Sequence, residues 1–217
     1  MTLIGVYGAS GFGREVMPLV REQMRAAGQP CEVVFVDDGA DDADGGSNGH
    51  RVLTYPQFLA EPAADKRLCF AIANSQVREK LATRAVGDGI ACMEVRGANA
   101  VVLDAVEIGT GAVLCPFVTL TSNIRIGKHF HANIYAYVAH DCVIGDYVTF
   151  APGAKCNGNV VIEDHAYVGT GAVLKQGKPG APLVIGKGAV VGMGAVVTRD
   201  VPAGTTVVGN PARPLVK

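Results

Sequence analysis

Apolar residues recur at every sixth position over much of the chain, beginning at Val102. Steps of six reach one apolar side chain after another: Ile108, Leu114, Leu120, Ile126, Ala132, Val138, Ile144, Phe150, Cys156, Ile162, Val168 and Leu174. Neither the 3.6-residue period of a helix nor the two-residue period of a strand produces this spacing. A strand of about four residues followed by a short corner does, with the periodic residue pointing into a shared interior.

Three such units close one triangular coil of 18 residues, so the pattern predicts a parallel β-helix. Four isoleucines one coil apart would then stack in a single column: Ile108, Ile126, Ile144 and Ile162. The six-residue spacing of apolar residues is interrupted after Leu174 and resumes at Ile185. The extra residues predict that the segment 175–184 forms a loop protruding from one corner.

The first ninety or so residues follow a different pattern, in which apolar runs alternate with helical segments. Strands are predicted at residues 2–8, 31–39 and 67–73, and helices within residues 9–28, 54–60 and 74–89. Four apolar residues share one side of the first helix: Val16, Leu19, Val20 and Met24. This alternation predicts a small parallel α/β sheet. The predicted domains are residues 1–96 and 97–217, and residues 40–50 are expected to form an exposed loop if the second strand ends at Asp38.

A glycine-rich turn joins the first strand to the first helix. It consists of Gly8, Ala9, Ser10, Gly11, Phe12 and Gly13. Glycines let the backbone approach a phosphate, and a helix N-terminus favours negative charge. Asp37 and Asp38 end the next strand, where a carboxylate can bind ribose hydroxyls. The pattern favours nucleotide binding, although a tight strand-to-helix turn without a ligand also needs glycine.

Composition excludes several classes of protein. The 217 residues include 19 basic and 20 acidic ones, so charge indicates neither nucleic-acid binding nor a polybasic membrane surface. No apolar run reaches the roughly 18 residues of a membrane-spanning helix, and the N-terminus does not resemble a signal peptide. The six cysteines show no CxxC spacing and are interpreted as free buried thiols of a cytoplasmic protein rather than disulfides or metal ligands.

The repeat and the closing segment "VVGMGAVVTRDVPAGTTVVGNPARPL" resemble the left-handed β-helix, hexapeptide-repeat acyltransferases. With the α/β domain in front, the chain resembles the bacterial sugar O- and N-acyltransferases of the sialic acid acetyltransferase and bacillosamine-pathway N-acetyltransferase type. The matching segments are "YGASGFGREV", "FVDD", "AIANSQVREKL" and "NIYAYVAHDCVIGD". The resemblance implies that the α/β domain binds a nucleotide-sugar and the β-helix binds acetyl-CoA, with no permanently bound cofactor or metal.

The same resemblance implies roles for individual residues. In the β-helix, Asn133 would line the active site from a neighbouring subunit of a homotrimer, and Gly158 would donate its backbone N–H to the thioester carbonyl. Further acetyl-CoA contacts are expected from Thr149, Thr170 and Met193. In the α/β domain, Asn74 joins the glycine turn and the two aspartates as a candidate acceptor-binding residue.

The pair His140-Asp141 carries the candidate chemistry. Acyl transfer from a thioester needs a base that takes the acceptor's proton, and imidazole titrates near neutral pH. Asp141 would orient the ring. Gly158 follows His140 by one full coil, and because stacked strands lie about 4.8 Å apart, we expect it directly beside the histidine. Without a ligand, the pair would be only a hydrogen-bonded corner of the coil.

The resulting hypothesis is an acetyltransferase that modifies the amino group of a nucleotide-linked amino sugar. Two alternatives remain: O-acetylation of a sugar hydroxyl, and a trimeric scaffold that senses nucleotides without catalysis. His129 and His131 flank Phe130 but have no third ligand at an evident spacing, so a metal site is not expected. His50 and His165 are interpreted as solvated or corner residues.

Overall fold

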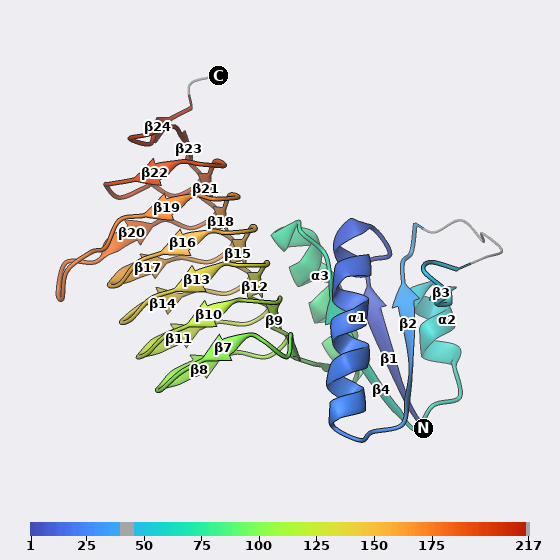
Figure 1. Ribbon diagram of the computed structural model, residues 1–217. Helices are drawn as coiled ribbons and strands as arrows, with labels where there is room; N and C mark the ends of the chain where they lie inside the picture. Colours follow the sequence, from blue (N-terminus) through green and yellow to red (C-terminus); the bar gives the residue numbers. More distant parts are fainter. Residues whose placement is uncertain (40–45, 216–217) are drawn as a thin grey trace. The chain divides into compact units, whose positions relative to one another are not determined.

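The structure, a computed structural model, describes residues 1–39 and 46–215 (Figure 1). It divides into two compact units, Met1–Ala98 and Asn99–Lys217. The sequence pattern had placed the last residue of the first domain at Arg96. None of the helices in the described part of the chain has the length and hydropathy needed to cross a bilayer.

Parallel strands form the sheet of the first unit, as expected from its apolar runs. Within the described residues the strand order is β3-β2-β1-β4-β5. The bounds are β1 Thr2–Tyr7, β2 Cys31–Val36, β3 Val52–Leu53, β4 Asp65–Phe70 and β5 Ala91–Cys92, and the short β6 spans Val95–Arg96. β1 lies at the centre, with Thr2 opposite both Cys31 and Asp65. Its side chains from Leu3 to Tyr7 are buried because helices cover a parallel sheet on both faces.

Three helices accompany this sheet: α1 Gly11–Ala26, α2 Tyr55–Ala60 and α3 Ser75–Gly87. The predicted apolar side of α1 is buried, and Pro18 lies inside the helix without ending it. α2 begins with a capping box, in which Thr54 and Gln57 satisfy each other's backbone N–H groups. β2 ends at Val36 rather than Asp38. Of the loop expected at residues 40–50, residues 40–45 lie outside the described residues.

At two positions of the glycine turn, the backbone conformation or a close backbone contact requires glycine. Gly8 has a φ of +107°, which L side chains rarely adopt. A Cβ on Gly13 would lie 1.8 Å from the carbonyl oxygen of Gly8. By contrast, a Cβ on Gly11 would meet nothing within 4 Å. Gly8 and Gly13 therefore hold the first turn of α1 close to β1, while Gly11 leaves open space.

The second unit is the parallel β-helix that the six-residue period predicts. Its strands are β7 Val101–Val102, β8 Val106–Ile108, β9 Val113–Leu114, β10 Thr119–Leu120, β11 Ile124–Ile126, β12 His131–Ala132, β13 Tyr137–Val138, β14 Val143–Ile144, β15 Thr149–Phe150, β16 Lys155–Cys156, β17 Val160–Ile162, β18 Tyr167–Val168, β19 Val173–Leu174, β20 Leu183–Ile185, β21 Val190–Val191, β22 Val196–Val197, β23 Thr206–Val208 and β24 Arg213–Pro214. One sheet contains β7, β10, β13, β16, β19 and β22; a second contains β8, β11, β14, β17 and β20; the third continues from β9 through β12, β15, β18 and β21 to β23 and β24. The pairings are parallel except that of β23 with β24.

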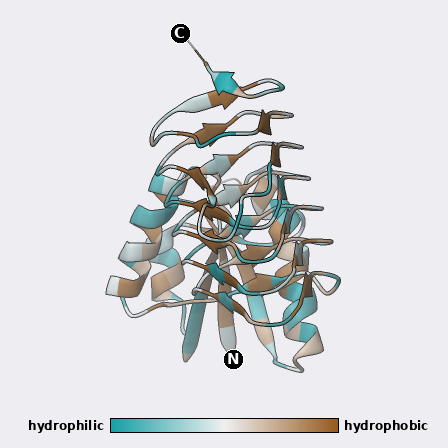
Figure 2. Cartoon of the chain, turned by 90° about the vertical axis from the view of Figure 1, so that its left-hand side faces the viewer, coloured by the Kyte–Doolittle hydropathy of each residue, from teal (hydrophilic) through white to brown (hydrophobic). Residues whose placement is uncertain are grey.

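The periodic residues fill the interior of this β-helix. Ile126 pairs with Ile108 and with Ile144, and Ile144 pairs with Ile162, so the predicted isoleucine column is present. All predicted positions from Leu114 to Leu174 belong to one buried cluster, whereas Val102 and Ile108, in the first coil, are partly buried. Figure 2 shows these hydrophobic segments recurring from coil to coil.

Each coil turns at three corners, and we name each after one of its residues. The His140 corner contains Ser122, His140 and Gly158; the Thr170 corner contains Ile134, Pro152, Thr170 and Met193; the Asp146 corner contains Lys128, Asp146, Asp164 and Lys187. Backbone hydrogen bonds link successive coils at each corner, for example from the N–H of Asn159 to the carbonyl of His140 (3.0 Å).

The predicted loop leaves the His140 corner between β19 and β20 (Figure 1). Ile185 pairs with Ile162, although 23 residues separate them instead of one coil's 18. Lys178 and Ala181 form an antiparallel bridge within the loop. The insertion therefore projects from the corner without disturbing the register of the coils.

Candidate active site

The glycine turn places the start of α1 at the carboxyl end of β1. The first turn of α1 contains no acidic residue, and its N-cap, Ser10, makes no side-chain capping hydrogen bond. Backbone N–H groups of a first helical turn have no partner within the helix and attract anions. With open space at Gly11, this helix end has the room and the polarity for a phosphate.

Asp37 supports the glycine turn instead of projecting freely. One carboxylate oxygen accepts a hydrogen bond from the N–H of Ala9 (2.9 Å), and the other accepts one from the N–H of Gly39 (3.0 Å). The sequence predicted a ribose-binding carboxylate here. The structure shows one oxygen of Asp37 holding the glycine turn at Ala9 and the other holding Gly39, two residues further along its own loop. Contact of this carboxylate with a ribose stays a prediction.

Asp38 has three partners on neighbouring elements. Its carboxylate accepts hydrogen bonds from the hydroxyl of Tyr7 (2.6 Å), the backbone N–H of Tyr55 (2.9 Å) and the guanidinium of Arg84 (2.9 Å). Burial alone would raise the pKa of Asp38, but these hydrogen bonds and the nearby Arg84 charge together hold it below its ordinary value. Asp38 is therefore ionised at neutral pH and held in place.

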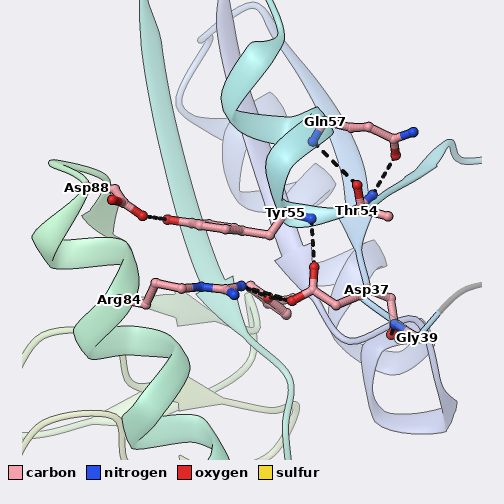
Figure 3. Close-up of polar contacts among 9 residues, drawn as sticks. Asp37, Gly39, Thr54, Tyr55, Gln57, Arg84 and Asp88 are labelled. Carbon is pink, nitrogen blue, oxygen red and sulfur yellow. Dashed lines mark hydrogen bonds and ion pairs between the residues drawn. The ribbon is translucent and has the colours of Figure 1, made fainter.

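Arg84 closes an aromatic cluster around Asp38, as Figure 3 shows in part. Its guanidinium carbon lies 4.0 Å from the centre of the Tyr55 ring, and Arg84 also donates to the hydroxyl of Tyr7. The Tyr55 hydroxyl donates to Asp88 (2.8 Å). Burial, then the hydrogen bond to a carboxylate, raises the pKa of both Tyr7 and Tyr55, so both remain protonated donors.

Sequence reasoning missed this cluster because its members come from separate elements. Tyr7 ends β1, Tyr55 starts α2, and Arg84 lies in the last turns of α3. No local spacing connects them. The available signal was the parallel topology itself, because the carboxyl ends of β1, β2 and β4 meet at one edge where Asp38 lies.

Asn74 lies at this same edge, as the N-cap of α3. Its side-chain oxygen accepts hydrogen bonds from the N–H groups of Gln76 (3.1 Å) and Val77 (3.0 Å). The side chain thus starts a helix, as asparagine commonly does. The structure therefore shows Asn74 capping α3, and its contact with the acceptor stays a prediction.

In the β-helix, His140 and Asp141 form the pair that the sequence suggested. Nδ1 of His140 lies 2.7 Å from a carboxylate oxygen of Asp141, and both side chains are about half exposed. A carboxylate only accepts hydrogen bonds, so Nδ1 carries the proton and Nε2 keeps a free lone pair in the neutral ring. Asp141 has a φ of +58°, a left-handed conformation that aspartate tolerates. The geometry fits a general base supported by a carboxylate.

Gly158 lies directly against the histidine ring, one coil further on. A Cβ at this position would be 2.5 Å from Cε1 and 2.6 Å from Nε2 of His140. Any other residue would displace the ring or be displaced by it. The absence of a side chain at Gly158 therefore makes room for the imidazole ring, and the two residues lie side by side as expected from the 18-residue spacing.

The other predicted β-helix residues lie away from His140 in the same chain. Asn133, whose side-chain nitrogen donates to the carbonyl of Phe150 (2.9 Å), enters the Thr170 corner. Thr170 and the 83% exposed Met193 belong to that corner as well. Thr149 is 4% exposed within β15, on a different sheet from His140's neighbouring strands β13 and β14. One chain therefore presents two separate groups of candidate residues.

The remaining histidines form part of the coil's packing. His129 and His165 stack on opposite faces of Tyr147 at the Asp146 corner, with ring centres 5.1 Å and 5.4 Å apart. His131 is buried in β12. Within residues 1–39 and 46–215, no group of three or more histidine, cysteine or acidic side chains is arranged to hold a metal ion.

All six cysteines lie among the described residues and are free thiols, but the expected burial holds for four of them, since Cys31 and Cys92 are only partly buried. Two of them, Cys142 and Cys156, bring their sulfur atoms to 3.9 Å inside the coil behind His140. Their burial fits a packing role.

Comparisons with known proteins agree with this architecture. A family model for the PglD N-terminal domain matches residues 3–85, and one for the bacterial transferase hexapeptide (six repeats) matches residues 123–158. The chain is 52% identical over 218 residues to the GDP-perosamine N-acetyltransferase of Escherichia coli O157:H7, covering 100% of this chain and 98% of that protein.

Two solved structures extend the comparison. WeeI from Acinetobacter baumannii AYE matches with a TM-score of 0.94 and 64% identity, covering 99% of this chain and 100% of that one. The acetyltransferase domain of PglB from Neisseria gonorrhoeae FA1090, in complex with acetyl coenzyme A, matches with a TM-score of 0.86 and 30% identity over 98% of both chains.

The fold and these matches define the class: the chain belongs to the sugar acetyltransferases of the left-handed β-helix superfamily. It is an acyltransferase that joins a PglD-type N-terminal domain to hexapeptide repeats. The family, the fold class and the enzyme class expected from the sequence are confirmed. The roles of the individual site residues are developed below as proposals.

Proposed function

We propose that the protein transfers the acetyl group of acetyl-CoA to the amino group of a GDP-linked amino sugar, with GDP-perosamine as the first acceptor to test. The choice of acceptor rests on the 52% identity to a GDP-perosamine N-acetyltransferase over the full chain. The observation that carries the chemistry is the His140–Asp141 pair with Gly158 against its ring.

In this proposal the amine nitrogen of the acceptor attacks the thioester carbonyl carbon, and Nε2 of His140 accepts the proton that this nitrogen loses. The backbone N–H of Gly158 donates to the carbonyl oxygen as that oxygen gains negative charge. Collapse of the tetrahedral intermediate breaks the carbon–sulfur bond and releases CoA, whose thiolate takes up the proton held by His140, so that the neutral imidazole is restored. Asp141 stabilises the imidazolium that forms in between, because its carboxylate lies 2.7 Å from Nδ1.

The α/β unit binds the acceptor nucleotide in this proposal. The N–H groups at the start of α1 face the phosphates, and Asp37 fixes the turn that leads to them. The nearby cluster of Arg84 and Asp38 supplies charged groups for the nucleoside. An arginine with its fork of N–H donors pairs well with the O6 and N7 edge of guanine, which fits a GDP-linked acceptor.

We further propose a homotrimer as the active form. His140 and Gly158 lie at one corner of the coil, whereas Asn133, Thr170 and Met193 lie at or beside another. A site that uses both groups needs two copies of the β-helix side by side. A triangular β-helix has flat, exposed faces, and these faces can pack against those of neighbouring copies. We also propose a cytoplasmic location, because free thiols persist in a reducing compartment.

The direct experiment is a screen of CoA release from acetyl-CoA against GDP-, UDP- and dTDP-linked amino sugars, with the His140→Ala protein as a control. Mass spectrometry of the product locates the acetyl group on nitrogen or oxygen. Turnover of a GDP-amino sugar that depends on His140 supports the proposal. Exclusive O-acetylation would establish the alternative sugar O-acetyltransferase, and absence of turnover with every GDP-linked amino sugar would contradict the proposed acceptor.

A further inference from the structure

The peptide group between Asn157 and Gly158 carries the N–H that the proposed reaction uses. The N–H groups on either side of it are hydrogen-bonded to neighbouring coils: that of Asn157 donates to the carbonyl of Leu174 (3.4 Å), and that of Asn159 donates to the carbonyl of His140 (3.0 Å). Among residues 1–39 and 46–215, no group accepts a hydrogen bond from the N–H of Gly158. This N–H is available to a substrate, and its direction depends on how its own peptide group is oriented.

The carbonyl of Asn157 belongs to the same peptide group, and it is turned toward the interior of the coil. Its oxygen lies 3.3 Å from Sγ of Cys142 and 3.6 Å from Sγ of Cys156. Both cysteines belong to the buried cluster that fills the β-helix. A trans peptide bond is planar, and its C=O and N–H point in opposite directions. The N–H of Gly158 therefore points away from the interior, at the corner that carries the His140 ring.

The two thiols stabilise this inward orientation of the carbonyl. Their sulfur atoms lie 3.9 Å apart, and Sγ of Cys142 also lies 3.6 Å from the carbonyl oxygen of His140. A thiol has one proton to donate, so Cys142 donates to one carbonyl at a time, and the oxygen of Asn157 is the nearer of the two. Because a buried carbonyl without a hydrogen bond costs free energy, these donors favour the peptide orientation that the structure shows.

The side chain of Asn157 holds the same residue by two further hydrogen bonds. Its Nδ2 donates to the carbonyl of Leu174 (2.7 Å), and its Oδ1 accepts from the hydroxyl of Tyr137 (2.9 Å). Gly158 has no side chain with which to fix its own backbone, and glycine is the residue with the greatest conformational freedom. The direction of its N–H is thus set by the contacts of Asn157.

We propose that Cys142 and Cys156 are positioning residues, whose thiols hold the Asn157–Gly158 peptide so that its N–H meets the thioester oxygen. This inference rests on the proposed function, in which that N–H donates to the oxygen as it gains negative charge. A donor that is already aligned stabilises the charge without reorganising during the reaction. The two cysteines act on the rate in this way without contacting either substrate.

The test compares alanine with serine at each of the two cysteines. Both substitutions remove the sulfur and leave a similar gap in the packing, but only serine keeps a donor for the carbonyl. Each alanine variant is expected to lower kcat about threefold to tenfold, and the double variant about tenfold to a hundredfold, because losing a whole oxyanion donor costs about 10²–10³. Each serine variant should lose less than its alanine counterpart. Cys115→Ala is the matched control, because Cys115 is also buried but follows β9, which lies in a different sheet from β16.

Binding of CoA, measured by calorimetry, separates positioning from a loss of packing. CoA has no thioester carbonyl, so its affinity should stay unchanged in every folded variant while kcat falls in the alanine variants. The KM of the acceptor should stay unchanged as well. Melting temperatures identify the folded variants, and if one Cys142 variant does not fold, the same comparison at Cys156 decides.

Three results would contradict the inference. Equal kcat in the alanine and serine variants of a cysteine, or a parallel loss of CoA binding, would overturn its role as a positioning residue. Because transfer to nitrogen and transfer to oxygen pass through the same oxyanion, this comparison holds for either acceptor. Absence of turnover by the wild type with any acceptor is a different result, which would contradict the proposed function and remove this inference with it.

Discussion

The two ring nitrogens of His140 have different roles in the proposed mechanism. Nδ1 is held by Asp141, and Nε2 lies in the part of the ring that packs against Gly158. Replacing Gly158 by alanine puts a methyl group 2.5 Å from Cε1 of the ring. The ring must then move, so Gly158→Ala is expected to lower kcat at least about tenfold. Steady-state kinetics and the melting temperature check this; an active variant with an unchanged kcat would contradict the placement.

In the proposed mechanism Asp141 positions the His140 ring. Substituting Asp141 therefore tests the orientation of the ring separately from the role of His140 as the base. Asn in its place can accept from Nδ1–H, or donate to Nδ1 and force the proton onto Nε2. Asp141→Asn is therefore expected to lower kcat by less than the about 10²–10⁴-fold typical of losing a general base. The KM for acetyl-CoA should stay unchanged. A kcat equal to that of the wild type would leave Asp141 with a purely structural role.

At this scale the sequence predicted some residues and missed others for a clear reason. His140 and Gly158 are separated by one full coil of 18 residues, so the period alone placed them side by side. The partners of Asp38 come from three elements that only the folded sheet brings together. The side chains of Asp37 and Asn74 are predicted to bind the acceptor; the structure adds that Asp37 holds the glycine turn and that Asn74 caps α3, which local spacing did not predict.

At the scale of elements, the strand β1, its glycine turn and helix α1 form one unit that carries the acceptor hypothesis. Gly11 has open space, whereas a Cβ on Gly13 would overlap the carbonyl of Gly8. Gly11→Val should therefore fold and raise the KM of the nucleotide-sugar about tenfold or more, with the KM of acetyl-CoA unchanged. Gly13→Ala is the contrasting variant and should destabilise the α/β unit. Equal damage to both KM values in a well-folded Gly11→Val would remove the turn from acceptor binding.

The Asp38 cluster ties β1, β2, α2 and α3 together, and its contribution depends on pH. The pKa of Asp38 is lowered in the folded protein, so the unfolded chain takes up this proton first as the pH falls. The stabilisation is present above the unfolded pKa and is lost as the pH falls through the folded one. Asp38→Asn should thus lower the melting temperature at neutral pH, and the difference should shrink toward strongly acidic pH. A difference that does not depend on pH would assign the loss to packing.

Elements with a long period were predictable, and the shortest were not. The repeat fixed the interior of the β-helix from Leu114 onward because every coil obeys one rule. β3 and β5 comprise two residues each, too few for any periodicity, and their place in the sheet depends on pairing with β2 and β4. The end of β2 at Val36 follows from the turn, since Asp37 and Asp38 are engaged by side-chain hydrogen bonds.

At the scale of the whole molecule, the proposed site combines two groups of candidate residues at different corners, and this proposal needs a second copy of the chain. The chain has a mass of 22.4 kDa, and the proposal predicts a solution mass three times larger. Mixing the inactive His140→Ala protein with a protein altered at Asn133 and Thr170 should restore part of the activity, because mixed trimers contain one intact site. A fully active monomer, or no recovery after subunit exchange, would contradict a site shared between subunits.

The central claim is that Nε2 of His140 takes a proton from an amine during acetyl transfer. Its most direct test is the rate of CoA release by wild type and His140→Ala with a GDP-linked amino sugar, from about pH 6 to about pH 9. We predict that His140→Ala loses about 10²–10⁴ in kcat near neutral pH while still binding acetyl-CoA. Part of the loss should be recovered at high pH, where the free amine no longer needs a base. Wild-type activity in His140→Ala across this range would contradict the claim.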